Sequence, residues 1–198
     1  MYKVYGMSSS GNCYKVRLLL TQLGETFEWI EVSTLKKQTR TPEFLKLNPN
    51  GKVPLLQLPD GRLLPESNAI LCYLAEGSAY LPADRWLRAE VLQWLFWEQY
   101  SHEPYIATAR FILHFVKDPD EPSLPLKRER GYQALAVMEQ HLSHRAFFVC
   151  ETYTVADLAL YAYTHVAHQG GFDLARFPAV QAWLGRVAAQ PRHLPLTW

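Results

Sequence analysis

The chain has 198 residues, of which 48% are hydrophobic and 20% are charged, and its formal net charge is +1. This composition is that of an ordinary folded protein and excludes a disordered chain or a fibre. No run of Lys or Arg is long enough to follow a phosphate backbone or an anionic membrane surface, so nucleic acid and membranes are not expected partners.

The N-terminus and the cysteines together predict a cytoplasmic protein. Residues 1–12 lack the apolar core of a signal peptide, and no stretch approaches the ~18 apolar residues that span a bilayer. The three cysteines, Cys13, Cys72 and Cys150, are widely spaced and include no CxxC pair. Such a set suits a reducing compartment better than a disulfide framework.

The N-terminal part of the sequence has an α/β pattern. Residues 3–5 predict a short strand, and the apolar spacing after the polar turn at 8–11 predicts a helix that Asn12 can cap and Gly24 can end. Residues 27–32 predict a second strand, which a right-handed crossover would place parallel to the first.

The next segment predicts a hairpin. Residues 35–48 are polar and indicate an irregular helix. Residues 54–58 and 62–64 predict antiparallel strands joined by the Pro-Asp-Gly turn at 59–61, and a helix is expected over 67–76. The N-terminal domain is therefore predicted to be a compact α/β unit of four strands.

The rest of the sequence predicts a helical bundle. Residues 83–117 form one long helical pattern that Pro104 should kink or split. Thr154 and Asp157 have the spacing of a capping box at the start of a helix. Further helices are expected over residues 127–143, 155–168 and 178–190. The predicted organisation is an α/β domain at 1–77, a linker at 78–84 and an all-helical domain at 85–198.

Pro54 is the first sequence feature that suggests a binding site, because a proline at the start of a strand removes a backbone donor. A cis Val53–Pro54 bond would turn the Val53 backbone outward, where its N–H and C=O could pair with an extended ligand as an added strand. A trans proline that opens an edge strand also explains the sequence, and it is the commoner arrangement.

Glu66 and Ser67 are the second such feature, because they lie where a strand turns into a helix. The N–H groups and dipole of a helix start favour an anion, and the carboxylate of Glu66 could hold an ammonium beside it. The pair would therefore suit the α-amino acid end of a ligand. In the alternative reading, Ser67 is an ordinary N-cap and Glu66 is a solvated charge.

Four motifs in order resemble the glutathione transferase family. The resemblance covers essentially the whole chain, and the matching segments are YGMSSSGN at residues 5–12, NPNGKVPL at 48–55, PESNAI at 65–70 and YTVADLAL at 153–160. The resemblance is to bacterial-type cytosolic members. It implies a thioredoxin-like first domain that binds glutathione, an all-helical second domain that binds the other substrate, and a homodimer.

The resemblance also implies the roles of the glutathione-binding residues. Residues 48–55 resemble the family's loop before its cis-proline strand, which implies a cis Val53–Pro54 bond. The Val53 backbone would pair with the cysteinyl unit, while Glu66 and Ser67 would hold the γ-glutamyl end. Lys52 would lie near the tripeptide. Arg40 is a looser match, because the segment 38–42 supplies this arginine but not the histidine found in some branches of the family.

Family members activate the thiol with a Tyr, Ser or Cys near the end of the first strand. Ser10, two residues before an asparagine at the helix start, resembles the serine type, whereas Tyr5 lies inside the strand. Ser8 and Ser9 are alternative hydroxyls. Cys13, in the first turn of the helix, could instead be a redox thiol or simply a small packed side chain.

The chemistry expected of Ser10 is thiolate stabilisation. A hydroxyl that donates to sulfur at the positive end of a helix favours the charged form and lowers the thiol pKa. A thiol with a pKa of ~8.5 is only about 3% ionised at pH 7, and lowering that pKa by ~2 units would ionise roughly three-quarters of it.

The electrophile is expected to bind between the domains. The candidate lining residues are Met7, Tyr100, Tyr105, Phe111 and Phe115, although aromatic residues at helical spacing are more often core. No metal is expected, because no carboxylate or cysteine completes either histidine pair, 141 with 144 or 165 with 168.

The most plausible activity is therefore conjugation of glutathione to small hydrophobic electrophiles, as in detoxification. Two alternatives stay open. One is glutathione-dependent reduction of disulfides or peroxides with Cys13 as the reactive thiol. The other is a non-catalytic binding protein that keeps the fold, because a fold does not by itself fix an activity.

Overall fold

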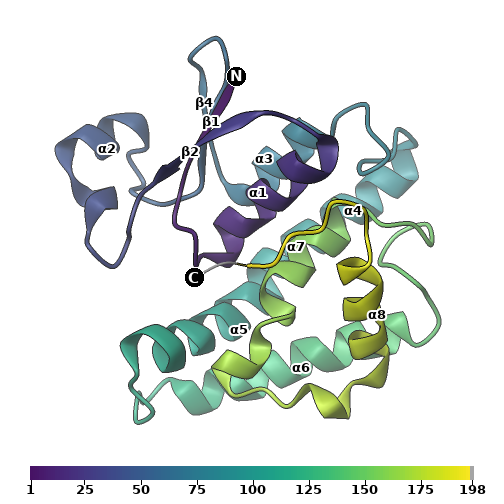
Figure 1. Ribbon diagram of the computed structural model, residues 1–198. Coiled ribbons are helices and arrows are strands. Elements are labelled where there is room, and N and C mark those ends of the chain that lie inside the picture. Colours follow the sequence, from purple (N-terminus) through teal and green to yellow (C-terminus); the bar gives the residue numbers. More distant parts are fainter. Residues whose placement is uncertain (197–198) are drawn as a thin grey trace. The chain divides into compact units, whose positions relative to one another are not determined.

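The computed structural model describes residues 1–196, which form two compact units (Figure 1). The first consists of Met1–Glu76 together with residues 191–196, and the second is Gly77–Gln190. The expected domain limits put the C-terminal residues in the helical domain, whereas the structure groups them with the first unit. The physical reason is that Tyr14 Oη donates to the carbonyl of Leu194 at 2.8 Å.

The first unit is built on a four-stranded sheet with the order β2-β1-β3-β4. Strand β1 pairs in parallel with β2 and antiparallel with β3, and β3 pairs antiparallel with β4. The predicted crossover and hairpin are therefore both present. The strands are β1 (Tyr2–Gly6), β2 (Phe27–Glu31), β3 (Leu55–Gln57) and β4 (Leu63–Pro65).

Helices cover this sheet. Helices α1 (Gly11–Leu23) and α3 (Ser67–Ala75) pack side by side, and the short α2 (Pro42–Leu47) lies on the opposite side of the strands (Figure 1). A 3-10 turn, Gln38–Arg40, precedes α2, which fits the irregular helix expected in this segment. The core between the sheet and the paired helices is fully buried at Val4, Val16, Leu19, Leu56 and Ile70.

The second unit is helical, and its first long segment is interrupted near Pro104. Proline lacks an N–H and clashes with the carbonyl four residues earlier, so it is tolerated in the first turn of a new helix. A π-helical turn, Glu98–His102, absorbs the irregularity. The helices are α4 (Arg85–Trp97), α5 (Glu103–Arg110), α6 (Leu124–Leu142), α7 (Val155–Thr164) and α8 (Pro178–Ala188), with a second π-helical segment, Phe111–Val116, after α5.

Helix α7 is the centre of the second unit, because every one of its residues is buried. The predicted capping box opens it. Thr154 Oγ1 accepts from Ala156 N at 3.3 Å, and Asp157 Oδ2 accepts from Thr154 N at 2.9 Å. The helix ends at Thr164, short of the expected residue 168, and a 3-10 turn follows it at Ala167–Gly170.

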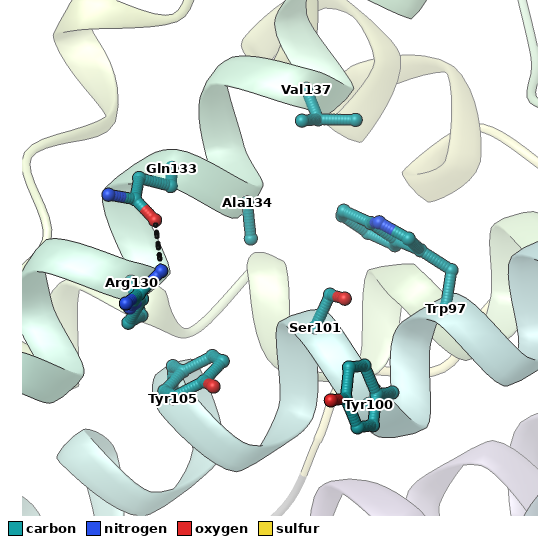
Figure 2. A pocket seen from close by; sticks show the side chains of 8 residues that line it. All are labelled: Trp97, Tyr100, Ser101, Tyr105, Arg130, Gln133, Ala134 and Val137. Carbon is teal, nitrogen blue, oxygen red and sulfur yellow. Dashed lines mark hydrogen bonds between the residues drawn. The ribbon is translucent and has the colours of Figure 1, made fainter.

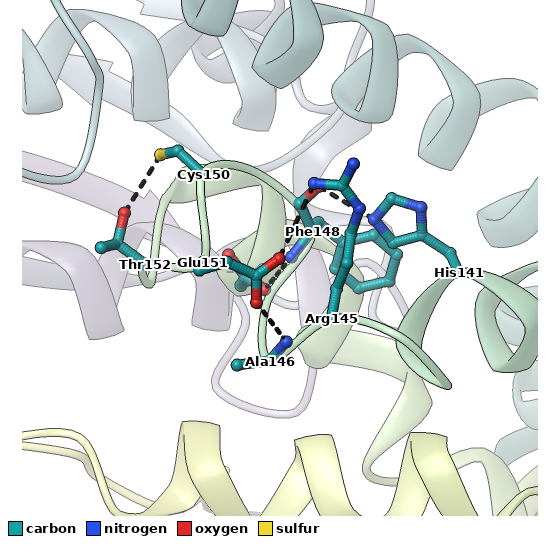
Figure 3. Close-up of polar contacts among 8 residues, drawn as sticks. His141, Arg145, Ala146, Phe148, Cys150, Glu151 and Thr152 are labelled. Carbon is teal, nitrogen blue, oxygen red and sulfur yellow. Dashed lines mark hydrogen bonds and ion pairs between the residues drawn. The ribbon is translucent and has the colours of Figure 1, made fainter.

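The loop that leads from α6 to α7 is held by its own polar contacts (Figure 3). Glu151 accepts from Ala146 N at 2.6 Å and forms an ion pair with Arg145 at 3.7 Å. His141 Nε2 donates to the Phe148 carbonyl at 3.0 Å. These contacts fix the chain just before the capping box.

The predicted fold class, a thioredoxin-like α/β domain followed by an all-helical domain, is confirmed. Within residues 1–196, no helix combines the length and the apolar character needed to cross a bilayer.

Candidate functional site

Ser10 caps the start of α1, where the sequence had suggested Asn12. Its backbone is extended (φ −81°, ψ 127°), and its Oγ accepts a hydrogen bond from Cys13 N at 3.4 Å. A hydroxyl that accepts a hydrogen bond keeps its own proton for another partner. The free N–H groups of the first turn and the helix dipole make this end positive. Ser10 thus has a proton to donate at a point that favours an anion.

Cys13 lies on the inner side of α1 and is fully buried. Its Sγ accepts a hydrogen bond from Met7 N at 3.4 Å. Burial raises the pKa of the thiol to about 11, and the nearby Ser10 hydroxyl and Met7 N–H only partly oppose this. The thiol is therefore protonated at neutral pH and closed off from solvent.

Ser8 has a different partner in the same turn. Its Oγ donates to Glu31 Oε2 at 2.7 Å and its N–H donates to Oε1 at 3.0 Å. Burial opposes the charged form of Glu31, but hydrogen bonds from Trp29 and Ser8 outweigh it and hold the carboxyl pKa below its ordinary value. The Ser8 hydroxyl therefore already donates its proton to the Glu31 carboxylate. Ser9 is partly exposed beside it.

Helix α3 starts next to the start of α1. Its first residue, Ser67, is buried, and its Oγ donates to Asn12 Oδ1 at 3.2 Å. Glu66 precedes it with φ 72°, a conformation that costs a non-glycine residue about 1–3 kcal/mol. Within residues 1–196 the exposed carboxylate of Glu66 has no hydrogen-bond partner. The turn therefore presents a helix N-terminus and an available carboxylate together.

The Val53–Pro54 peptide bond is cis, as the resemblance implies. Strand β3 begins only at Leu55, and the N–H and C=O of Val53 make no hydrogen bond within the part of the chain that the structure describes. An extended ligand could pair with both groups. The preceding loop is held by buried Asn48, whose Nδ2 donates to the Lys52 carbonyl at 2.9 Å.

Arg40 and Lys52 lie at the exposed edge of this loop. Arg40 Nη1 donates to the Asn50 carbonyl at 3.2 Å. Gly51 has φ 62°, and a Cβ there would lie 2.6 Å from Arg40 Nη1, so glycine permits both the turn and the close approach of the guanidinium. Both cations thus flank the segment that leads to Val53.

The residues expected to bind the electrophile fall into different environments. Met7, in the first unit, is 9% exposed, and Thr34 Oγ1 donates to its Sδ at 3.3 Å. In the second unit, Tyr100 and Tyr105 line a pocket of about 430 Å³, and Phe111 is an exposed residue outside this lining. Figure 2 shows both tyrosines on one wall of the pocket, together with Trp97, and Arg130 joined to Gln133 on α6.

One histidine of each pair donates a hydrogen bond to a backbone carbonyl. His141 Nε2 donates to the Phe148 carbonyl at 3.0 Å, and His165 Nδ1 donates to the Tyr161 carbonyl at 2.7 Å. Among residues 1–196, no group of three or more His, Cys, Asp or Glu side chains is arranged to hold a metal ion.

Asn12 and Asn48 lie within the candidate site, and the sequence did not reveal their contacts. Asn12 joins the start of α1 to Ser67, and Asn48 shapes the loop before Val53. Both lie inside the motifs that carry the resemblance. The available signal was a short amide side chain beside a turn, which commonly bonds to nearby backbone.

Two family models match the chain. The model of the N-terminal domain of glutathione S-transferase matches residues 9–76, and the model of its C-terminal domain matches residues 93–191. The two matches follow one another along the chain and overlap each of the two compact units.

Individual proteins resemble the chain over most of its length. A glutathione S-transferase structure from Pseudomonas fluorescens is 55% identical, with a TM-score of 0.97 and 98% of each chain covered. A glutathione transferase from Phanerochaete chrysosporium, in complex with oxidized glutathione, is 27% identical, with a TM-score of 0.87 and coverage of 96% of this chain and 92% of that one. A disulfide-bond oxidoreductase of Escherichia coli (strain K12) is 29% identical over 187 residues, which are 91% of this chain and 87% of the relative.

Proposed function

The chain belongs to the glutathione S-transferase family, and from this premise we propose that it is a glutathione transferase of the serine type. It activates the thiol of glutathione for attack on small hydrophobic electrophiles. The observation that carries the proposal is Ser10, whose hydroxyl caps α1 and keeps a proton to donate at a positive helix end. Glutathione is the co-substrate, which is supported by the similar fungal structure that contains oxidized glutathione.

Glutathione binds to the N-terminal α/β domain, which the sequence predicts at residues 1–77. Its cysteinyl unit pairs with the free N–H and C=O of Val53, beside Pro54, as an added strand. Its γ-glutamyl end takes its carboxylate to the N–H groups of α3 at Ser67 and its ammonium to Glu66. Arg40 and Lys52 supply positive charge to the glycyl end.

Ser10 activates the sulfur without a base. Its hydroxyl donates to the thiolate, and the hydrogen bond and the helix dipole both favour the charged form. The thiol proton passes to solvent. The thiolate sulfur then forms the carbon–sulfur bond, while the electron pair of the bond that breaks at the electrophilic carbon leaves with the leaving group or, in an addition, takes up a proton from water. A fall of ~2 units in the thiol pKa would increase the nucleophile at pH 7 roughly 25-fold.

A second candidate function is glutathione-dependent disulfide reduction, which the similarity to the Escherichia coli oxidoreductase favours. A mechanism that uses Cys13 is opposed by burial of the thiol and by its raised pKa. A purely non-catalytic binding role is opposed by the combination of Ser10 with the free groups of Val53 and Glu66.

The electrophile is proposed to bind on the helical domain, which the sequence assigns to residues 85–198, with Tyr100, Tyr105 and Phe111 as contacts. Met7, in the first unit, stays a proposed contact from the sequence. The aromatic lining of the pocket at Tyr100 and Tyr105 supports this. We also propose a cytoplasmic homodimer. Sedimentation as a strict monomer would contradict the dimer.

The test of the serine mechanism is the pH dependence of conjugation. Ser10→Ala should raise the pKa seen in the profile and lower the rate at neutral pH, while glutathione still binds. Ser10→Gly is a second variant, because glycine caps a helix at a cost of only a few tenths of a kcal/mol. Ser8→Ala is the matched control and should leave the profile unchanged. A wild-type profile in both Ser10 variants would refute the assignment.

A further inference from the structure

Lys15 is a charged residue at the centre of the glutathione-binding unit that the proposed function does not use. Its side chain is fully buried on α1, which is rare for a lysine. Its Nζ donates to Asn68 Oδ1 at 3.3 Å. Removing an ammonium from water costs several kcal/mol, and a methionine would fill the same space without that cost. The charge is therefore expected to have a function.

Lys15 bonds to the residue next to the γ-glutamyl turn. Asn68 is the second residue of α3 and follows Ser67, whose Oγ donates to Asn12 Oδ1. Asn12 and Lys15 are three residues apart on α1 and so lie on one face of that helix. Ser67 and Asn68 of α3 thus form hydrogen bonds to Asn12 and Lys15 on one face of α1. These two bonds fix the position and rotation of the start of α3.

The buried charge would also favour an anionic ligand. The start of α3 already favours an anion through its N–H groups and dipole. The Lys15 ammonium, bonded to Asn68 in the first turn of α3, would add positive potential there. Lys15 therefore supports the same carboxylate in two ways, by holding the donor groups in place and by its charge.

We propose that Lys15 is a positioning residue for glutathione: it holds Asn68 and the first turn of α3 in the geometry that receives the γ-glutamyl carboxylate. The proposal rests on the proposed function, because it assigns Lys15 to the same glutathione site. It predicts an effect on glutathione binding that is separate from any effect on the electrophile or on folding.

The experiment measures the Kd of glutathione by calorimetry and the two KM values in wild type, Lys15→Met and Lys15→Arg. Lys15→Met should raise the Kd and the KM for glutathione about tenfold and leave the KM for the electrophile within twofold. Lys15→Arg should restore part of the affinity, because it keeps the charge. Lys3→Met is the control, since Lys3 is a half-exposed lysine that forms an ion pair with Glu28.

Folding is tested separately. Lys15→Met should keep or raise the denaturation midpoint, since loss of a buried charge is often neutral or stabilising. If it does not fold, Asn68→Ala replaces it and should weaken glutathione binding in the same way. If Lys15→Met folds, Asn68→Ala should add little to its effect, because both variants remove the same contact.

Three results would overturn the proposal. Wild-type glutathione affinity in folded Lys15→Met would remove Lys15 from the site and leave the proposed function intact. Equal rises in both KM values would indicate a general structural role. Failure of the wild-type protein itself to bind glutathione would refute the proposed function, and this inference with it.

Discussion

The backbone N–H of Met7 donates to the Sγ of Cys13 at 3.4 Å, so the end of β1 closes over the thiol in the first turn of α1. A thiol in this position is a packing group, because its pKa is raised by burial to about 11 and little thiolate forms. A second hydrogen bond, from Ser10 N to the Met7 carbonyl at 2.9 Å, fixes the turn that leads into Ser10.

The first prediction is that Cys13 does not react with thiol reagents in the native protein. Mass spectrometry after alkylation at pH 8 should find the label on the partly exposed Cys72 and Cys150 and none on Cys13. Cys13→Ala should carry the same number of labels as wild type and conjugate glutathione at the same rate. A mixed disulfide between glutathione and Cys13 would instead support the reductase alternative.

The second prediction concerns Glu66. Glu66→Gln should weaken glutathione binding roughly tenfold to a hundredfold, because a charge-assisted hydrogen bond to the ligand ammonium is worth about 1.5–3 kcal/mol. Calorimetry of folded protein measures this directly. Glu25→Gln, which removes another exposed carboxylate in the same unit, should bind normally. Unchanged affinity in Glu66→Gln would take this residue out of the site.

The fold class could be predicted because the apolar spacing of a helix or strand and the residues of a turn depend on residues close together in the sequence. Two short apolar segments on either side of the turn at Pro59–Gly61 predicted the hairpin, and the Thr154 to Asp157 spacing predicted the capping box. Two features were not predicted. One is the pair of π-helical turns in the long helical segment, and the other is the return of residues 191–196 to the first unit, which depends on contacts distant in sequence.

The sequence predicted less of the candidate glutathione site than of the fold. The resemblance implied the cis bond at Pro54, whereas general frequency favoured trans. The choice of Ser10 over Ser8 came from the sequence and stays a prediction, while in the structure Ser8 forms two hydrogen bonds to Glu31. The buried Lys15 had no signal in the sequence, because a lysine on a helix is usually a solvated charge.

The third prediction concerns the capping box of α7. Thr154 is fully buried, and its Oγ1 both accepts from Ala156 N and donates to Asp157 Oδ2 at 3.1 Å. Thr154→Ala should therefore lower the free energy of unfolding by about 1–2 kcal/mol, measured by urea denaturation. Thr154→Ser keeps the hydroxyl and should lose less of the free energy of unfolding. Activity per folded molecule should not change, and an unaltered midpoint in the alanine variant would contradict the role.

The last prediction is a pH dependence that comes from Asp157. This carboxyl is fully buried and accepts hydrogen bonds from Phe148 N at 3.0 Å, Trp183 Nε1 at 2.9 Å and Thr154 N at 2.9 Å. Burial raises its pKa from 3.8 to about 6 in spite of these donors. Between pH 3.8 and 6 the unfolded chain has lost the proton that the folded chain retains, so stability falls as pH rises through this window.

Across this window the loss approaches about 3 kcal/mol, since each pKa unit is worth about 1.4 kcal/mol. Asp157→Asn cannot titrate, so the comparison of its unfolding free energy with that of wild type isolates the group. The stability of wild type relative to this variant should fall by about 2 kcal/mol between pH 4 and pH 7. Other titrating groups are common to both proteins and cancel. If wild type instead gained relative stability as pH rises, the hydrogen bonds would outweigh burial, and the carboxyl pKa would lie below 3.8 in the folded protein.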